Sequence, residues 1–137
     1  MKIGHIENGI VLDHITAGNG MNIYNVLNLG KLDCAVALIK NAESPKMGKK
    51  DIIKISTLLD LDLDVLGYLD PGITVNVIRD GEVAEQRTLE LPQRVVGVIK
   101  CKNPRCITSV EREIVHEAKL TDPVKKIYRC IYCEQKV

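Results

Sequence analysis

Apolar and polar residues alternate in short stretches over the first half of the chain, and their spacing predicts two strands, a helix and a third strand. An Asn8-Gly9 pair lies between KIGHIE and IVLDHI, a pattern typical of a β-hairpin. From Thr16 to Leu29 the apolar positions suit a helix, with Thr16 as its cap and Gly30 as its end. The apolar run CAVALI at 34–39 predicts a buried strand, and the polar residues at 41–50 predict a loop.

A similar series follows. The stretch DIIKISTL at 51–58 is typical of a strand, and the acidic and apolar residues at 60–67 predict a short helix. Asp80-Gly81 separates apolar stretches at 73–78 and 82–91, which is a strong hairpin signal. The whole order predicts an α+β fold: a ferredoxin-like sandwich with an antiparallel sheet and two helices on one face.

The pattern changes after Pro92, where short apolar stretches surround cysteines in IVHEAKL and KKIYRCIYC, with a turn at Asp122-Pro123. We therefore expect two domains, residues 1–92 and 93–137, the second being small and all-β. A domain of about 40 residues seldom buries enough apolar surface to fold alone, so a metal ion is expected to help.

Four cysteines in this second part have the spacing C-x4-C-x23-C-x2-C: Cys101, Cys106, Cys130 and Cys133. Two closely spaced pairs of thiolates are typical of one tetrahedral Zn²⁺. Because all four positions are filled by protein, the predicted zinc ion is structural, one per chain. Four free thiols, or a redox pair at Cys130 and Cys133, are the alternatives. Cys34 lies in an apolar run and is interpreted as a small buried residue.

Composition excludes several classes of function. The net charge of the 137 residues is only +1, which favours neither nucleic acid nor a membrane surface as a partner. Residues 1–97 carry 10 basic and 13 acidic side chains, whereas residues 98–137 carry 9 basic and 5 acidic ones. The N-terminal residues do not resemble a secretory signal, and the apolar runs are too short to span a bilayer. We expect a cytoplasmic protein, in which clustered cysteines bind metal rather than form disulfides.

Charged residues of the first domain suggest a nucleotide site. Asp13 and His14 follow an apolar strand, where a carboxylate can accept hydrogen bonds from ribose hydroxyls and a histidine can meet a phosphate. Lys49, Lys50 and Lys54 would suit a polyphosphate. A solvated strand end and a solvated edge strand are the alternatives.

Familiar catalytic patterns are missing from the sequence. It has neither a phosphate-binding loop nor a dinucleotide fingerprint, and neither a Ser-His-Asp elbow nor a pair of candidate acid and base carboxylates. With three histidines and no open metal site, the chain is not expected to be an enzyme.

Several motifs taken in order, GIVLDHI, MGKKDIIKI, TVNVI, LP, CKNPRCIT and CIYCE, resemble those of the regulatory chain of aspartate carbamoyltransferase, almost from end to end. The resemblance implies an N-terminal domain that binds a nucleotide effector such as CTP or ATP. It also implies a C-terminal zinc domain that holds the catalytic chain, and pairing of two regulatory chains as a dimer.

The resemblance also assigns residues to the nucleotide site. Asp13 matches the ribose-contacting aspartate of the family, His14 its phosphate-side histidine, and Lys54 a lysine that reaches the ribose and base. The remaining matched positions line or border the base pocket: Ile3, Ile6, Val11, Val83 and Lys50.

Two positions depart from the family pattern. Gln86 stands where a second phosphate-binding lysine is found, and Gly81 where a tyrosine lies near the base. Arg87 is adjacent, but neighbouring side chains of a strand point to opposite faces, so it is not expected to replace that lysine. We therefore predict a weakened nucleotide site.

The zinc domain is expected to present polar and aromatic residues to a protein partner: Asn103, Arg105, Tyr132 and Glu134. Its positive charge suits an acidic patch on a catalytic subunit. The sequence thus predicts a non-catalytic regulatory subunit that binds neither nucleic acid nor membrane. The alternative is a zinc-ribbon module that binds nucleic acid, which the basic C-terminal part supports weakly because few aromatic residues accompany it.

Overall fold

The computed structural model describes residues 6–137 and divides the chain into two compact units, Met1–Leu89 and Glu90–Val137. The expected boundary after residue 92 lies three residues beyond this division. No helix within residues 6–137 has the length and apolar character needed to cross a membrane.

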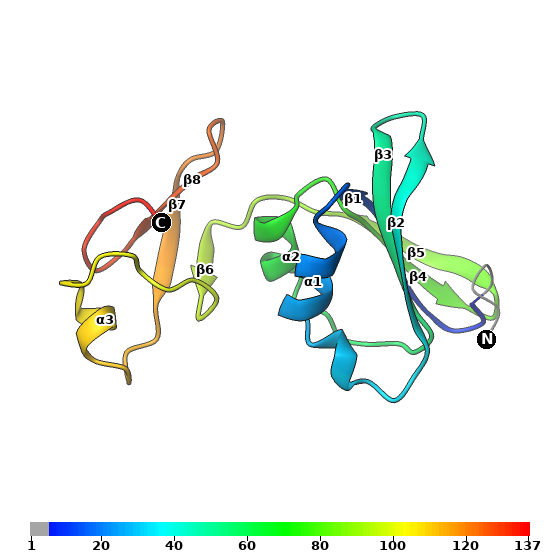
Figure 1. Ribbon diagram of the computed structural model, residues 1–137, viewed down its shortest axis with the longest axis horizontal. Coiled ribbons are helices and arrows are strands. Elements are labelled where there is room, and N and C mark those ends of the chain that lie inside the picture. Colours follow the sequence, from blue (N-terminus) through cyan, green and yellow to red (C-terminus); the bar gives the residue numbers. More distant parts are fainter. Residues whose placement is uncertain (1–5) are drawn as a thin grey trace. The chain divides into compact units, whose positions relative to one another are not determined.

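A five-stranded antiparallel sheet forms the first unit, with strand order β2-β3-β1-β4-β5 (Figure 1). Its elements are β1 (Gly9–Thr16), α1 (Gly20–Val26), the 3₁₀ turn η1 (Leu29–Lys31), β2 (Val36–Ser44), β3 (Gly48–Ile55), α2 (Leu63–Leu69), β4 (Thr74–Arg79) and β5 (Glu82–Thr88). Strands β1 to β4 with two helices have the ferredoxin-like order, and β5 extends the sheet at the edge beside β4. The predicted α+β class is confirmed.

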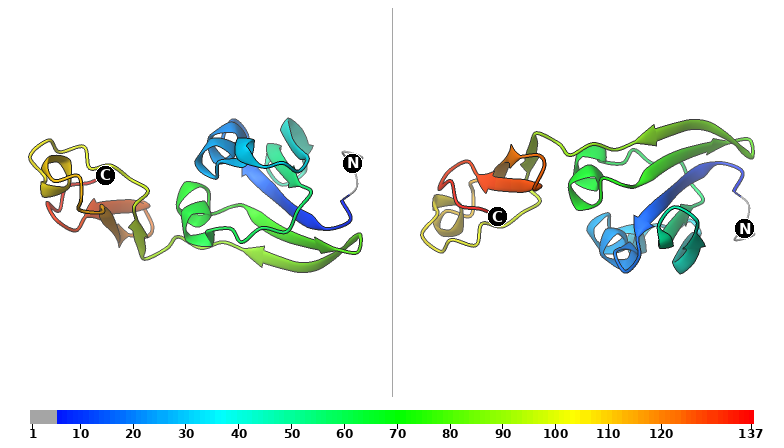
Figure 2. Two further views of the ribbon diagram at one scale, coloured as in Figure 1. Left: turned by 90° about the horizontal axis from the view of Figure 1, so that it is seen from below. Right: turned by 90° about the horizontal axis from the view of Figure 1, so that it is seen from above.

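Both helices cover the same face of this sheet (Figures 1 and 2). Ile23 of α1 and Leu66 of α2 are fully buried in one apolar cluster with side chains from the strands. The strand residues in that cluster are Ile10, Leu12, Ile15, Ile53, Ile55 and Val75. Helices of seven residues are too short to be stable alone, so this burial is what holds them.

The predicted first helix begins too early. Thr16 is the last residue of β1, where it pairs with Lys50 and its backbone N–H donates to the carboxylate of Asp70 at 2.7 Å, and Asn19 takes the cap position instead. The helix starts at Gly20 and ends after Val26, because Asn28 takes a left-handed conformation with φ of 55°. The second helix lies closer to the prediction at 60–67. The side chain of Asp62 caps α2 by accepting from the N–H groups of Asp64 and Val65.

Two turn predictions have opposite outcomes. Asp80 and Gly81 both have positive φ, 52° and 79°, and join β4 to β5 in the predicted hairpin. The hairpin at Asn8-Gly9 is wrong, because Gly9 is itself the first residue of β1 and pairs with Ile78. A side chain at Gly9 would place its Cβ 2.0 Å from the carbonyl oxygen of Ile55, so this glycine permits close strand packing.

The predicted loop at 41–50 is also wrong, because β2 and β3 extend into it as a hairpin.

Strand β1 contains a bulge that decides which residues leave the core. Leu12 pairs with Ile53 and Ile15 pairs with Asp51, so Asp13 and His14 together lie opposite one residue of β3. His14 has φ of 58°, in the left-handed region. The extra residue returns Ile15 to the buried face and leaves Asp13 and His14 half-buried, outside the apolar cluster.

A fully buried carboxylate joins three segments of the first unit. The side chain of Asp51 accepts hydrogen bonds from the backbone N–H groups of Gly18 (3.0 Å), Gly20 (2.9 Å) and Asn41 (2.9 Å). Burial raises the pKa of Asp51, but these donors outweigh it, so the pKa lies below the ordinary value of 3.8. The carboxylate thereby fixes both the start of α1 and the irregular turn of β2 at Asn41.

The second unit is a three-stranded antiparallel sheet in the order β6-β7-β8, with one short helix. Its elements are β6 (Arg94–Val96), α3 (Ile107–Val110), β7 (Glu117–Asp122) and β8 (Ile127–Cys130). The two long strands and the turn after Asp122 agree with the sequence analysis, whereas β6 and α3 were not predicted. Its buried hydrophobic residues are few: Val95, Cys106, Ala118, Leu120, Tyr128 and Cys130.

We expect Asp51→Asn to lower the free energy of unfolding of the first unit by about 3 kcal/mol, because an amide oxygen cannot accept from all three N–H groups. Chemical denaturation followed by circular dichroism measures this loss. Since the pKa of Asp51 is lowered on folding, its contribution is complete above pH 4 and fades as pH falls through the lowered value. Exposed Asp60→Asn is the matched control; an equal loss in both variants would contradict the assigned role.

Candidate metal centre and effector face

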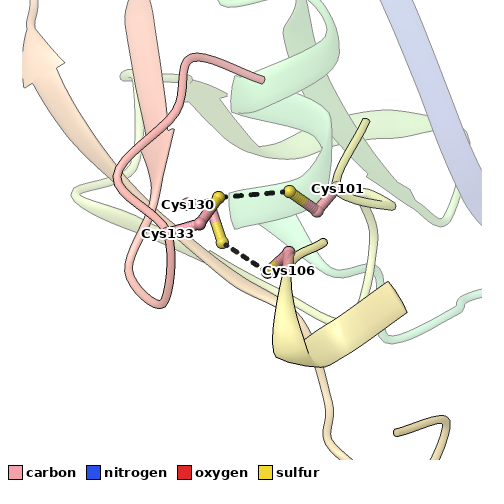
Figure 3. A group of neighbouring side chains, drawn as sticks. All are labelled: Cys101, Cys106, Cys130 and Cys133. Atoms are coloured by element: carbon pink, nitrogen blue, oxygen red, sulfur yellow. Dashed lines mark hydrogen bonds between the residues drawn. The ribbon is translucent and has the colours of Figure 1, made fainter. Parts of the chain in front are cut away.

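The four cysteines of the second unit lie close together (Figure 3). Cys101 lies in the loop before α3, Cys106 immediately precedes that helix, Cys130 ends β8 and Cys133 lies in the following turn. All four sulfur atoms are within 4.8 Å of one another. The sulfur of Cys101 lies 3.5 Å from that of Cys133, and the sulfur of Cys106 lies 3.7 Å from that of Cys130.

These distances fit one tetrahedral ion. Four sulfur atoms at about 2.3 Å from a common centre lie about 3.8 Å from one another. Each of these two contacts joins a cysteine from the first loop to one from the second, so a single ion would tie the two loops together. The set is closed by four protein ligands, which makes it suited to a structural site.

Backbone amides and hydroxyls stabilise negative charge on these sulfurs. The Thr108 hydroxyl, whose oxygen lies 3.1 Å from the Cys106 sulfur, is the main cause that lowers the pKa of Cys106. A backbone contact with Gln135 lowers the pKa of Cys133, whereas burial raises the pKa of Cys101 and of Cys130. Because a bound metal requires thiolates, binding of an ion here would release thiol protons.

The redox alternative finds no support in this arrangement. None of the five cysteines is in a disulfide, and the sulfurs of Cys130 and Cys133 lie 3.7 Å and 3.5 Å from cysteine sulfurs of the other loop. Cys34 lies half-buried against the apolar cluster of the first unit, as expected for a small hydrophobic residue.

His116 also lies in the second unit but is not part of the cysteine cluster. It is buried, both of its ring nitrogens lack hydrogen-bond partners among residues 6–137, and burial lowers its pKa. It is therefore a neutral core residue. His5 lies outside the described residues.

Charged residues of the first unit meet around the bulge of β1. The Lys50 ammonium lies 2.9 Å from the Asp13 carboxylate, which also accepts from the His14 backbone N–H at 2.7 Å. Burial raises the pKa of Asp13, but Lys50 and the His14 N–H outweigh it and bring the pKa below its ordinary value. Nδ1 of His14 lies 3.1 Å from the Thr74 hydroxyl. The structure thus brings together three of the predicted nucleotide residues and adds Thr74.

We call the sheet face opposite α1 and α2 the effector face. Strand pairing places further residues on it. Val11 pairs with Lys54 on one side and Asn76 on the other, and Asn76 pairs with Gln86. Directly paired residues of antiparallel strands project from the same face. Gln86 therefore shares a row with Val11 and Lys54, and Asn76 is a further member that the sequence analysis missed, because register cannot be read from composition.

Arg87 belongs to the other face. It pairs with buried Val75, bonds to Glu85 at 2.8 Å, and lines a hollow beside Leu61 on the helix side of the sheet. The expectation that Arg87 and Gln86 point in opposite directions agrees with this geometry.

The apolar members of the predicted site lie farther along the effector face. Val83 pairs with Ile78, which pairs with Gly9, and Ile6 lies against Gly9. Val83 is 59% exposed and Ile6 is buried. Gly81 lies in the β4–β5 turn, where its N–H donates to the carbonyl of Glu7 at 2.8 Å. Ile3 lies outside the described residues.

The predicted interface residues lie on the two cysteine loops. The Asn103 side chain accepts from the backbone N–H of Arg105 at 3.1 Å, and the Tyr132 hydroxyl donates to the Val115 carbonyl at 3.3 Å. Arg105 and Glu134 are exposed. Exposed apolar side chains accompany them on α3 and beside Tyr132: Ile107, Val110, Val115 and Ile131.

Together the two units define a class of protein in which a ferredoxin-like α+β domain precedes a small four-cysteine metal-binding domain. Residues 1–90 match the family described as aspartate carbamoyltransferase regulatory chain, allosteric domain, and residues 93–137 match the metal binding domain of the same chain. The chain belongs to the family of aspartate carbamoyltransferase regulatory chains.

The similarity to curated relatives extends over nearly the whole length of each protein. The chain is 53% identical to the aspartate carbamoyltransferase regulatory chain of Clostridium acetobutylicum and 52% identical to that of Clostridium botulinum, covering 98% of this chain and 92% of each relative. It is 41% identical to that of Bifidobacterium longum, over 99% of this chain and 98% of the relative. The chain is thus a non-catalytic regulatory chain of a pyrimidine-pathway enzyme, with allosteric and metal-binding domains.

We expect one bound metal ion per chain, and Cys130→Ala to lose it and unfold residues 93–137 while most of the first unit stays folded. A structural thiolate site supplies on the order of 10 kcal/mol to a small domain. Elemental analysis and amide hydrogen exchange measure the two effects. Cys34→Ala, a cysteine outside the cluster, is the matched control, and full metal retention by the Cys130 variant would contradict the assignment.

Proposed function

We propose that this chain binds one structural Zn²⁺, binds nucleoside triphosphate effectors on the effector face and holds the catalytic chain of aspartate carbamoyltransferase through its metal domain. The observation that carries the proposal is the match of both units, in order, to the allosteric and metal-binding domains of one regulatory chain. Residues 1–92 would form the effector domain and residues 93–137 the zinc domain.

Zinc is the ion that this donor set favours. Four thiolates in a tetrahedral arrangement suit Zn²⁺, whereas hard ions such as Mg²⁺ prefer oxygen ligands. A closed shell of Cys101, Cys106, Cys130 and Cys133 leaves no position for a substrate, so the ion would support the fold and the loops that bear the interface residues. We place the chain in the cytoplasm, where thiols stay reduced.

Residues of the effector face supply the groups that a nucleotide needs. Asp13 would accept from ribose hydroxyls, His14 would meet a phosphate, and Lys54 would reach the ribose and base. Lys50 would border the site and hold Asp13 in place, as its 2.9 Å contact suggests. Ile3, Ile6, Val11 and Val83 would surround the base.

Two protein partners complete the proposal. The catalytic chain would contact Asn103, Arg105, Tyr132 and Glu134, whose loops the metal orders, with the exposed apolar side chains of α3 adding buried area. A second regulatory chain would form a dimer with this one. Binding an effector would shift the equilibrium between two quaternary states only by the difference in its affinity for them.

We expect weak nucleotide binding, with a Kd in the high micromolar range or above, because Gln86 replaces a cation in the row that contains Lys54. Gln86→Lys should tighten CTP and ATP binding about tenfold or more, as one charge-assisted hydrogen bond is worth roughly 1.5 to 3 kcal/mol. Calorimetric titration of the purified chain measures it. Arg87→Gln, on the other face, should leave the affinity unchanged; weaker binding by that variant would mean that Arg87 reaches the phosphates.

We also expect the zinc-loaded chain to form a stable complex with the catalytic subunit and the chelated chain to lose it, because the interface loops depend on the metal. Size-exclusion chromatography of the two mixtures measures complex formation. Readdition of Zn²⁺ should restore the complex. Equal complex formation with and without metal would remove any role of the zinc domain in holding the catalytic chain.

A further inference from the structure

A row of four cations crosses the small sheet of the second unit. Arg94 of β6 pairs with Lys119 of β7, Lys119 pairs with Arg129 of β8, and Arg129 forms a bridge with Lys136 near the C-terminus. Directly paired residues project from one face, and neighbouring strands lie about 4.8 Å apart, so the row spans about 14 Å. We call these four residues the basic row.

Like charges directly opposite each other destabilise a sheet, so such a row needs an explanation. All four side chains are exposed, and the other face of the same strands carries the buried residues Val95, Ala118 and Cys130. The apolar core and the metal ligands therefore do not require cations on this face.

Internal neutralisation of the basic row is incomplete. The Arg94 guanidinium pairs with the Glu117 carboxylate, and Arg129 donates to the backbone carbonyl of Glu134 at 3.2 Å. Within residues 6–137, Lys119 and Lys136 form no ion pair. Glu134 lines the same surface, so the four cations are accompanied there by two acidic residues, Glu117 and Glu134.

The surface is hollowed at this place. Three members of the basic row, Arg94, Lys119 and Arg129, line a hollow of about 550 Å³, and its other lining residues are Thr121, Cys130, Ile131 and Glu134. That volume matches a small ligand rather than the face of a macromolecule. A chain of phosphates carries several negative charges close together, so it can meet consecutive cations of the row, which a single carboxylate cannot.

We propose that the basic row and its hollow form a binding site for a phosphate chain, either inorganic or the triphosphate of a nucleotide. This site lies on the metal-binding unit and uses none of the residues of the effector face. Occupancy would neutralise the repulsion among Arg94, Lys119 and Arg129 and so would stabilise the sheet that carries Cys130.

The test uses the zinc-loaded full chain, titrated at low salt with sodium tripolyphosphate and followed by two-dimensional NMR. We expect the backbone amide signals of Lys119 and Arg129 to shift, and Lys119→Gln to weaken this binding about tenfold or more. Lys125→Gln, an exposed lysine of the following turn, makes the same change in net charge and should leave the affinity unchanged. Glu134→Gln should tighten binding, because it removes a carboxylate from the hollow.

Stability gives a second readout that does not depend on the NMR signals. Without added anion at low salt, Lys119→Gln should raise the melting temperature of the second unit and Lys125→Gln should not. Tripolyphosphate should then raise it for the native chain and far less for Lys119→Gln.

Several results would overturn the proposal. They are unshifted Lys119 and Arg129 signals, equal weakening by Lys119→Gln and Lys125→Gln, or tighter binding of hexaglutamate or of oligothymidylate than of tripolyphosphate. Tighter binding of hexaglutamate would make the row a surface for an acidic protein, and tighter binding of oligothymidylate would make it a surface for nucleic acid. ATP in place of tripolyphosphate separates the two sources: tighter binding of ATP with shifts near Lys119 indicates a nucleotide, and equal binding indicates the phosphate chain alone. Shifts confined to Val11 and Lys54 would contradict this site while supporting the effector face.

Discussion

The bulge in β1 is the constraint on which the first unit depends. In the central strand, Ile10, Leu12 and Ile15 are all buried, yet the step from Leu12 to Ile15 is three residues, which a regular strand would send to opposite faces. One additional residue at Asp13 and His14 restores the parity. The same irregularity that keeps the core closed therefore places a carboxylate and an imidazole beside Lys50 and Thr74 at the surface.

The second unit rests on a different interaction. Its three short strands bury few apolar side chains, and two of the buried residues are themselves cysteines of the metal centre, Cys106 and Cys130. A domain of this size without a metal would be marginal at best. The hydrogen bond from the Tyr128 hydroxyl to the Pro92 carbonyl, at 2.7 Å, ties the beginning of the unit to β8, which ends at Cys130. A metal ion bound by the four cysteines would therefore join loops that the apolar core alone leaves weakly connected.

Local patterns in the sequence predicted the features that depend on few residues. The turn at Asp80-Gly81 requires positive φ at both residues and joins β4 to β5 as predicted. The cysteine spacing predicted that four sulfur atoms would lie close together, because each pair comes from one loop. The sequence predictions were wrong where contacts between residues distant in the sequence determine the local structure. Thr16 was assigned to a helix because its bond to Asp70 is invisible in a local window, and the role of Asp51 depends on three N–H groups from two other segments. Likewise, Thr74 and Asn76 join the candidate nucleotide site only through strand register.

Charge shows most clearly how register changes the interpretation of a sequence. Arg94, Lys119, Arg129 and Lys136 are scattered over 43 positions and give a net charge that looks ordinary, but pairing aligns them in one row. The same pairing separates Gln86 from Arg87, which are neighbours in sequence and lie on opposite faces of the larger sheet. A cation that is adjacent in sequence to a binding residue, as Arg87 is to Gln86, therefore cannot replace a cation on the same face of the sheet. For both units, the electrostatic character of a face follows from which residues the strands bring opposite each other, and composition alone does not reveal it.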